Sequence, residues 1–267
     1  MSTASPRPRK RSPSEVQRAV LFALFIRELQ TRFGGRWLGA FWVLLEPLAH
    51  LTLLMLVFGY VRNRVLPGIE FPVFLLTGLL PFLTFRSLAL RLMESVDANR
   101  PLFSYRQVKP LDPLISRALL EIGLYGTIYL ILLVTLGWLG YSTVPTRPLE
   151  LMAISIALLV LGFALGLIFA VGTDELPRVR PFIRIAFMPL YLLSGVIFPV
   201  SALPAFVLPW VLWNPVLHAV EISRGYFFPH YRTLPQVSAL YVIVWGVAAL
   251  AVGVSLYRVR RHRLLAS

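Results

Sequence analysis

Three polar or aromatic residues recur at intervals of four in an otherwise apolar stretch: Trp42, Glu46 and His50. In a helix this spacing places all three side chains on one face. A charge at the middle of a membrane costs at least ~2.5–3.5 kcal/mol, so it normally faces a partner or a wet cavity. This face therefore either lines a polar conduit or holds helices together, through a Glu46–His50 pair or a hydrogen bond to another helix.

A second group of candidate residues lies in the polar, proline-rich segment 95–113. Leu102, Phe103 and Tyr105 stand here among basic residues, a composition suited to docking into a groove of another protein. The alternative is a solvated loop with one aromatic side chain touching lipid headgroups.

A third candidate is the pair Glu221 and Arg224, three residues apart. These side chains either contact sugar hydroxyls or carboxylates of a ligand or form a structural ion pair.

Motifs for catalysis are missing from the sequence. The phosphate-binding pattern G-x-x-x-x-G-K-[ST] is absent, and the only lysines are Lys10 and Lys109, so ATP hydrolysis in the P-loop manner is excluded. The patterns H-E-x-x-H and G-x-S-x-G are also absent, there are no cysteines, and the four histidines lack metal-ligand spacing. We expect no enzyme, no metal site and no cofactor in this chain.

Composition places the chain in a membrane. Apolar residues make up 57% and charged residues 14%, whereas a soluble domain carries about 25% charged residues. The net charge of +14 is concentrated beside the apolar segments. That distribution favours contact with anionic lipid headgroups and argues against nucleic-acid binding.

The hydropathy pattern predicts an all-α membrane protein with six transmembrane helices. Residues 1–13 form a disordered basic tail, and 14–36 a cytoplasmic interfacial helix with a capping box of Ser14 and Gln17. A single transmembrane domain occupies 37–267. The spans run approximately over 38–61, 71–92, 117–140, 149–171, 182–200 and 236–257.

Basic residues set the orientation. With the N-terminus inside, 20 of the 26 Lys and Arg residues lie on the cytoplasmic side and five outside, which predicts that both termini are cytoplasmic. The apolar stretch 203–231 contains Pro204, Pro209 and Pro215. We therefore expect a re-entrant pair of half-helices between spans five and six, broken near Asn214–Pro215.

Six sequence runs resemble those of capsular-polysaccharide export permeases, part of the type-2 ABC exporter family. They occur in order at the expected spacing: RELQTRFGGRWLGAFWVLLEPLAH (27–50), FPVFLLTGLLPF (71–82), ANRPLFSYRQVKPLD (98–112), RALLE (117–121), LLSGVIFPVSALP (192–204) and LWNPVLHAVEISR (212–224). The resemblance covers nearly the whole chain after about residue 15.

The resemblance implies a homodimeric permease in the cell inner membrane, served by two separate ABC ATPase subunits that bind ATP and Mg²⁺. The substrate would be a lipid-linked acidic polysaccharide, passed on to a periplasmic adaptor and an outer-membrane export protein.

By the resemblance, 98–112 looks like the coupling segment and 27–37 like the cytoplasmic entrance. Together with the spacing arguments above, it suggests roles for three sets of residues. A substrate conduit would include Arg32, Phe33, Arg36, Trp37, Trp42, Glu46 and His50. Coupling to the ATPase would use Asn99, Leu102, Phe103, Tyr105, Arg106, Lys109 and Asp112. An outer re-entrant gate would contain Trp213, Asn214, His218, Glu221 and Arg224.

Three alternatives stay open. A sibling exporter would carry O-antigen or a teichoic-acid-like polymer. A membrane-embedded glycosyl- or acyltransferase would need acidic or His residues converging at one interface, and a proton-coupled transporter would use Glu46 and His50 without ATP.

Overall fold

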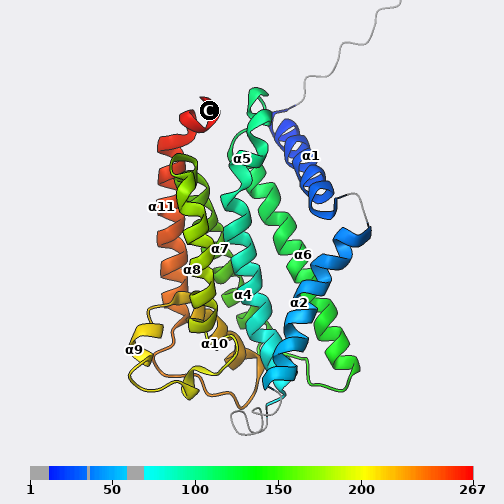
Figure 1. Cartoon of the computed structure of the whole chain (residues 1–267), viewed down its shortest axis with the longest axis vertical. Coiled ribbons are helices and arrows are strands. Elements are labelled where there is room, and N and C mark those ends of the chain that lie inside the picture. Colours follow the sequence, from blue (N-terminus) through cyan, green and yellow to red (C-terminus); the bar gives the residue numbers. More distant parts are fainter. Residues whose placement is uncertain (1–11, 35–36, 59–68, 267) are drawn as a thin grey trace, which may run out of the picture.

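The computed structural model describes residues 12–34, 37–58 and 69–266, and within these ranges the fold consists of helices and loops without strands (Figure 1). Three short 3₁₀ turns are η1 (Arg100–Ser104), η2 (Pro177–Val179) and η3 (Val200–Ala202). The α-helices are α1 (Pro13–Phe33), α2 (Trp37–Phe58), α4 (Phe71–Met93), α5 (Ser95–Asn99), α6 (Leu111–Trp138), α7 (Pro148–Glu175), α8 (Arg180–Leu193), α9 (Leu208–Val211), α10 (Pro215–Phe227) and α11 (Ala239–Ala266).

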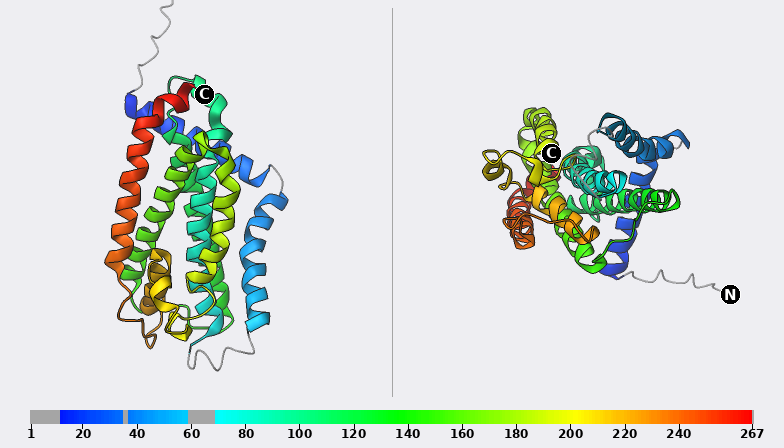
Figure 2. Two further views of the ribbon diagram at one scale, coloured as in Figure 1. Left: turned by 60° about the vertical axis from the view of Figure 1, so that its left-hand side comes forward. Right: turned by 90° about the horizontal axis from the view of Figure 1, so that it is seen from below.

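The long helices stand side by side and define two ends of the bundle. α1, α5 and the C-terminal end of α11 lie at one end, here called the inner end (Figure 1). α9 and α10 with their connecting loops gather at the opposite, outer end, which a second view also shows (Figure 2).

α4 forms the centre of the bundle. It is apolar nearly all round, and such a helix is stable only when neighbours enclose it. Its side chains from Phe71 to Leu80 are all buried, and α6, α7 and α10 pack around it.

Small residues bring α7 close to α4. A Cβ added at Gly166 would lie 2.7 Å from Cβ of Leu92, and one at Gly162 would lie 3.3 Å from the carbonyl oxygen of Phe85. A side chain at Gly166 would force the helices apart, and one at Gly162 would crowd α4; small residues are common at helix interfaces in membranes.

Within the part of the chain that the structure describes, four helices are long and apolar enough to cross a membrane: α4, α6, α7 and α11. The expected fifth span, 182–200, differs, because α8 has only 14 residues and ends at Leu193. At 1.5 Å per residue such a helix covers about 21 Å, less than a hydrocarbon core of about 30 Å. Gly195, with φ of 66°, turns the chain just beyond it.

The start of α1 corrects one prediction. The N-cap is Ser12, whose hydroxyl accepts from the backbone N–H of Glu15, while the Glu15 carboxylate accepts from the N–H of Ser12. The predicted capping box of Ser14 and Gln17 is therefore wrong. Pro13 favours the earlier start, because proline fits the first helical position, where no intrahelical N–H bond is lost.

The outer segment breaks where the sequence indicates. α10 begins at Pro215, and the Asn214 side chain caps it by accepting from the N–H of Val216 at 2.9 Å. A helix boundary therefore lies at the position of the predicted break near Asn214–Pro215.

Candidate functional site

A buried polar seam joins α1 to α6 at the inner end. Arg117 on α6 donates two hydrogen bonds to the Glu28 carboxylate of α1, at 2.8 and 2.9 Å. It also donates to the carbonyl oxygen of Arg91 at 2.9 Å. Asn99 donates to Glu28 at 3.2 Å and accepts from Arg27 at 2.5 Å. With both charges satisfied, α1 is fixed against the inner ends of α4, α5 and α6.

A second carboxylate, Glu121 on α6, lies one helical turn further into the bundle. It accepts from the Ser87 hydroxyl at 2.5 Å and forms ion pairs with Arg91 at 3.2 Å and Arg32 at 3.7 Å. Only 1% of its side chain is exposed. The two guanidinium groups compensate a charge that would otherwise be very costly inside an apolar span.

Beside Glu121 lies a polar cavity of about 150 Å³, which several elements line together. Its walls include Arg32 from α1, Glu46 from α2, Arg86 and Arg91 from α4, and Tyr125 from α6. Arg86 is exposed and forms no ion pair with any residue that the structure describes. Three guanidinium groups against the carboxylates of Glu46 and Glu121 make this inner cavity cationic.

The predicted conduit residues occupy several different surroundings. Arg32 and Glu46 meet at the inner cavity, and Trp42 is exposed on α2. His50 shares a hydrogen bond with the Tyr191 hydroxyl of α8 at 3.0 Å. Phe33 instead lines an apolar groove of about 470 Å³ between α1 and α6. Arg36 lies outside the described residues, as does the side chain of Trp37.

The predicted coupling residues divide into buried and exposed groups. Asn99 and Asp112 are buried, and Asp112 accepts from Gln17 at 2.6 Å and from the N–H of Lys109 at 2.8 Å. Leu102 and Phe103 are half-buried, and Phe103 packs on an apolar cluster of the inner end. The exposed members are Tyr105, Arg106 and Lys109.

Ion pairs connect this loop with the neighbouring helices. Arg100 donates to Asp97 at 2.9 and 3.1 Å and also contacts Asp174 at the end of α7. The hydrogen bond to Asp97 raises the pKa of the Arg100 guanidinium above its ordinary value, and the charge of Asp174 acts in the same direction. The base of the exposed loop is thereby attached to α7.

At the outer end Arg224 is fully buried on α10. It donates to the carbonyl oxygens of Gly195 and Val196, at 2.6 Å each, and its guanidinium lies 3.6 Å from the centre of the Phe74 ring. Glu221 Oε2 lies 3.9 Å away and accepts from Tyr231 at 2.8 Å. The separation and the burial of both side chains fit the ion-pair alternative for Glu221 and Arg224.

The other predicted gate residues fix the loops around α10. His218 Nδ1 accepts from the N–H of Ser238 at 3.0 Å, so Nε2 carries the proton and donates to the carbonyl oxygen of Leu212 at 2.8 Å. Asn214 donates to the Ser194 hydroxyl at 2.9 Å. Trp213 is exposed, and its carbonyl oxygen accepts from Tyr241 at 3.0 Å.

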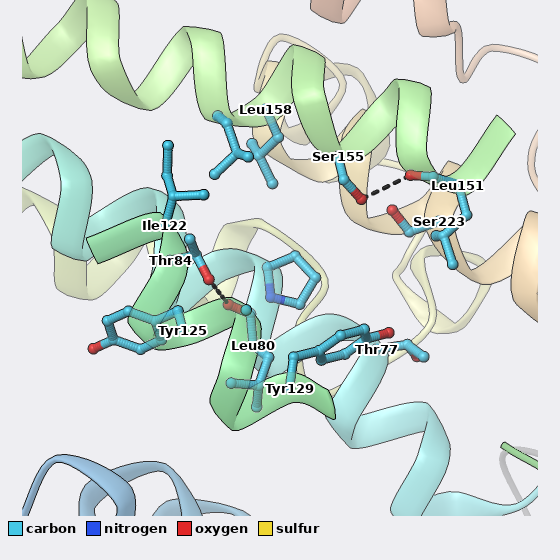
Figure 3. Close-up of a pocket in the computed structure, with 13 residues that line it drawn as sticks. Thr77, Leu80, Thr84, Ile122, Tyr125, Tyr129, Leu151, Ser155, Leu158 and Ser223 are labelled. Carbon is cyan, nitrogen blue, oxygen red and sulfur yellow. Dashed lines mark hydrogen bonds between the residues drawn. The ribbon is translucent and has the colours of Figure 1, made fainter. Parts of the chain in front are cut away.

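An apolar pocket of about 160 Å³ lies between α4, α6 and α7 (Figure 3). Hydroxyls of Thr77, Tyr129 and Ser155 are set among leucines in its wall. None of the predicted conduit residues lines it, although Tyr125 borders both this pocket and the inner cavity.

Sequence reasoning missed the partners of Glu28 and Glu121. A usable signal was present, because Arg117 and Glu121 are four residues apart and share one face of α6. Charged residues on the same face at the end of an apolar span require partners, but their spacing along α6 does not identify the partners on other helices.

Comparison with known proteins shows the family. The sequence pattern of the ABC-2 type transporter family matches residues 19–228. The chain belongs to this family. The predicted membership of the type-2 ABC exporters is therefore confirmed.

Relatives within this family are similar over almost their full length. The polysialic acid transport protein KpsM of Escherichia coli is 40% identical over 257 residues, which cover 96% of this chain and 99% of KpsM. The capsule polysaccharide export inner-membrane protein BexB of Haemophilus influenzae is 26% identical over 89% of each chain. CtrC of Neisseria meningitidis, which carries the same description, is 28% identical over 90% of each.

Proposed function

We propose that this protein is the permease subunit of an ABC exporter that moves lipid-linked capsular polysaccharide across the inner membrane. The observation that carries the proposal is the 40% identity to a polysialic acid transport protein over 99% of that protein's length. Since this chain lacks a P-loop, ATP and Mg²⁺ are bound by two separate ATPase subunits.

The proposed topology has six crossings with both termini cytoplasmic. α1 is the interfacial helix, α2, α4, α6, α7, α8 and α11 cross the membrane, and α9 and α10 are the re-entrant pair. With the N-terminus inside, this topology would place 20 of the 26 Lys and Arg residues on the cytoplasmic side, which supports it. The start of α1 and the C-terminal end of α11 also lie at one end of the bundle (Figure 1).

The fifth crossing combines α8 with the irregular segment after Leu193. Irregular backbone at membrane depth is tolerated only where protein satisfies its polar groups. Arg224 meets this requirement by donating to the carbonyl oxygens of Gly195 and Val196.

The ATPase docks on the inner loop that contains η1. Tyr105, Arg106 and Lys109 provide an exposed aromatic and basic surface, and Leu102 and Phe103 anchor the loop from below. Asn99 and Asp112 hold the loop in place through partly buried hydrogen bonds to α1. We call this exposed surface, Tyr105–Lys109, the docking loop.

The polymer passes between two copies of the chain, along the face of α2 that carries Trp42, Glu46 and His50. Trp42 and Glu46 are exposed in the single chain, so a second copy is free to face them. The cationic inner cavity suits an acidic polymer or the phosphate of its lipid anchor. On the outer side an adaptor and an outer-membrane channel continue the path.

The test measures capsular polysaccharide on cells that lack the gene, with the cytoplasmic pool assayed in parallel. Loss from the surface together with accumulation inside is expected for an exporter, and restoring the gene should reverse both. Loss from both compartments would reject export in favour of synthesis by a membrane transferase. The accumulated material identifies the polymer.

A further inference from the structure

α8 packs on the core through one face only, which carries Ile183, Phe187, Leu190 and Tyr191. Among its side chains only Phe187 is buried, and large apolar side chains such as Phe182, Ile185 and Met188 are exposed. Pro189 interrupts its hydrogen-bonding pattern. A helix held through one face shifts as a unit at lower cost than a helix enclosed on all sides, such as α4.

Two arginines attach the inner end of α8 to the segment that precedes the docking loop. Arg184 pairs with Glu94, the residue at the joint between α4 and α5, and Arg180 pairs with Asp97 within α5. Arg180 also donates to the carbonyl oxygen of Thr173 at 3.3 Å.

Asp97 belongs at the same time to the base of the docking loop. One of its oxygens accepts both bonds from Arg100, the first residue of η1, and the other faces Arg180. A displacement of η1 therefore acts on α8 through one carboxylate. The Glu94–Arg184 pair lies beside it as a second, parallel link.

These pairs are only half-buried, with 47% of the Glu94 side chain and 54% of the Arg184 side chain exposed. Such pairs contribute little to folding stability, because water screens them. Both pairs join the inner end of α8 to the segment between α4 and η1.

The outer end of α8 is attached to a different part of the molecule. Asn214 donates to the Ser194 hydroxyl, and Arg224 holds the carbonyl oxygens of Gly195 and Val196. Gly195, at φ 66°, provides a turn between these two attachments. α8 thus connects the segment beside the docking loop with the outer α9–α10 region.

We propose that the Glu94–Arg184 and Asp97–Arg180 ion pairs transmit movement of the docking loop to α8, and through it to the outer region. The four side chains are positioning residues for transport, and none of them needs to touch the polymer. This inference rests on the proposed function, because it requires an ATPase that moves the loop.

The experiment exchanges the charges of the more exposed pair. The variants are Glu94→Lys, Arg184→Glu and the double exchange, each purified with its ATPase and assayed in liposomes for polymer transport and ATP hydrolysis. Each single variant should lower transport per ATP hydrolysed about fivefold or more, with the amount of bound ATPase unchanged. The double exchange should restore transport to within about twofold of the original, because the pair is re-formed with opposite polarity.

The matched control is Arg178→Glu. Arg178 is exposed two residues before α8 and has no ion pair within the described ranges. This variant changes the net charge as Arg184→Glu does, and it should leave transport per ATP unchanged. If a charge reversal lowers the amount of protein, Glu94→Gln, Arg184→Gln and their combination replace the set. The combination should then be no worse than either single change, because both remove the same link.

Two results overturn the inference. The first is that the single variants transport as much polymer per ATP as the original protein. The second is that the double exchange loses as much transport as the two single losses multiplied together. Either result would show that the pair transmits no movement. If the unchanged protein neither binds an ATPase nor restores surface polymer in the deletion strain, the proposed function fails, and the coupling role fails with it.

Discussion

Each end of the bundle contains one deeply buried arginine, and the two are satisfied differently. Arg117 at the inner end binds the carboxylate of Glu28 through two hydrogen bonds and, in addition, one backbone carbonyl oxygen, that of Arg91. Arg224 at the outer end binds two backbone carbonyl oxygens, while the nearest carboxylate oxygen, of Glu221, is 3.9 Å away. A carboxylate partner joins one helix to another, whereas carbonyl partners hold an irregular segment in shape.

The contrast indicates different tasks for the two ends. The inner end is assembled from long helices locked by complementary charges. The outer end depends on one cation to replace the hydrogen bonds that the turn at Gly195 does not make itself. We therefore expect the inner end to respond to charge changes and the outer end to respond to small changes in volume near Arg224.

The largest expected effect is at the inner pair. Arg117→Met keeps much of the volume but leaves the buried Glu28 charge without its main partner, which costs about 3–5 kcal/mol. We expect a strong loss of folded protein, measured as the yield of monodisperse protein and its thermal unfolding in detergent. Arg106→Met, at an exposed position, is the control and should be as stable as the original protein. If the two variants are equally stable, the assigned role of Arg117 is contradicted.

The second largest expected effect comes from adding side-chain volume beside Arg224 at the outer end. A Cβ at Gly78 would lie 2.3 Å from Nη2 of Arg224 and 2.9 Å from the carbonyl oxygen of Val196, so Gly78→Ala should cost about 1–3 kcal/mol of folding free energy. Gly126→Ala on α6 meets nothing within 4 Å and should be neutral or stabilising by up to about 1 kcal/mol. Thermal unfolding of both variants measures these changes in stability. A Gly78→Ala protein as stable as the original would refute the tight packing around Arg224.

The exposed docking loop should affect binding without affecting stability. Tyr105→Ala and Arg106→Glu are each expected to weaken ATPase binding about tenfold, corresponding to about 1.4 kcal/mol. Co-purification at several ATPase concentrations measures this loss, and thermal unfolding of the permease alone should be unchanged. Undiminished binding by both variants would move the docking surface elsewhere.

The smallest effect concerns the start of α1. Ser12→Ala removes the hydroxyl that caps Glu15 and should cost about 1 kcal/mol, whereas Ser14→Ala leaves that cap in place. Hydrogen exchange of the first turn of α1 measures the difference directly. Faster exchange in the Ser14 variant than in the Ser12 variant would reverse the assignment of the cap.

Much of the architecture followed from local signals. Hydropathy predicted the regions of α4, α6, α7 and α11, and Pro215 together with Asn214 predicted the helix break at the outer end. The early end of α8 was not predicted, because the apolar run continues past Leu193. Hydropathy does not distinguish a helix from an irregular segment whose carbonyl groups are satisfied by a distant arginine.

The candidate sites were predicted less completely. The spacing of Trp42, Glu46 and His50 placed them on one helix, but the partner of His50 is Tyr191 on α8, which no local pattern indicates. Asn99 and Asp112 were grouped with the exposed loop residues, yet they are buried against α1. Which member of a polar loop faces inward depends on the helix that covers it.

By itself the sequence determined the membrane class, the strongly basic net charge and the absence of a P-loop, because composition, charge and motifs are properties of the chain alone. The tertiary structure decided which charges pair. Arg117 meets a carboxylate 89 positions away, and Arg224 meets carbonyl groups 28 and 29 positions away. Such contacts depend on the rotation and packing of whole helices, which local periodicity does not specify.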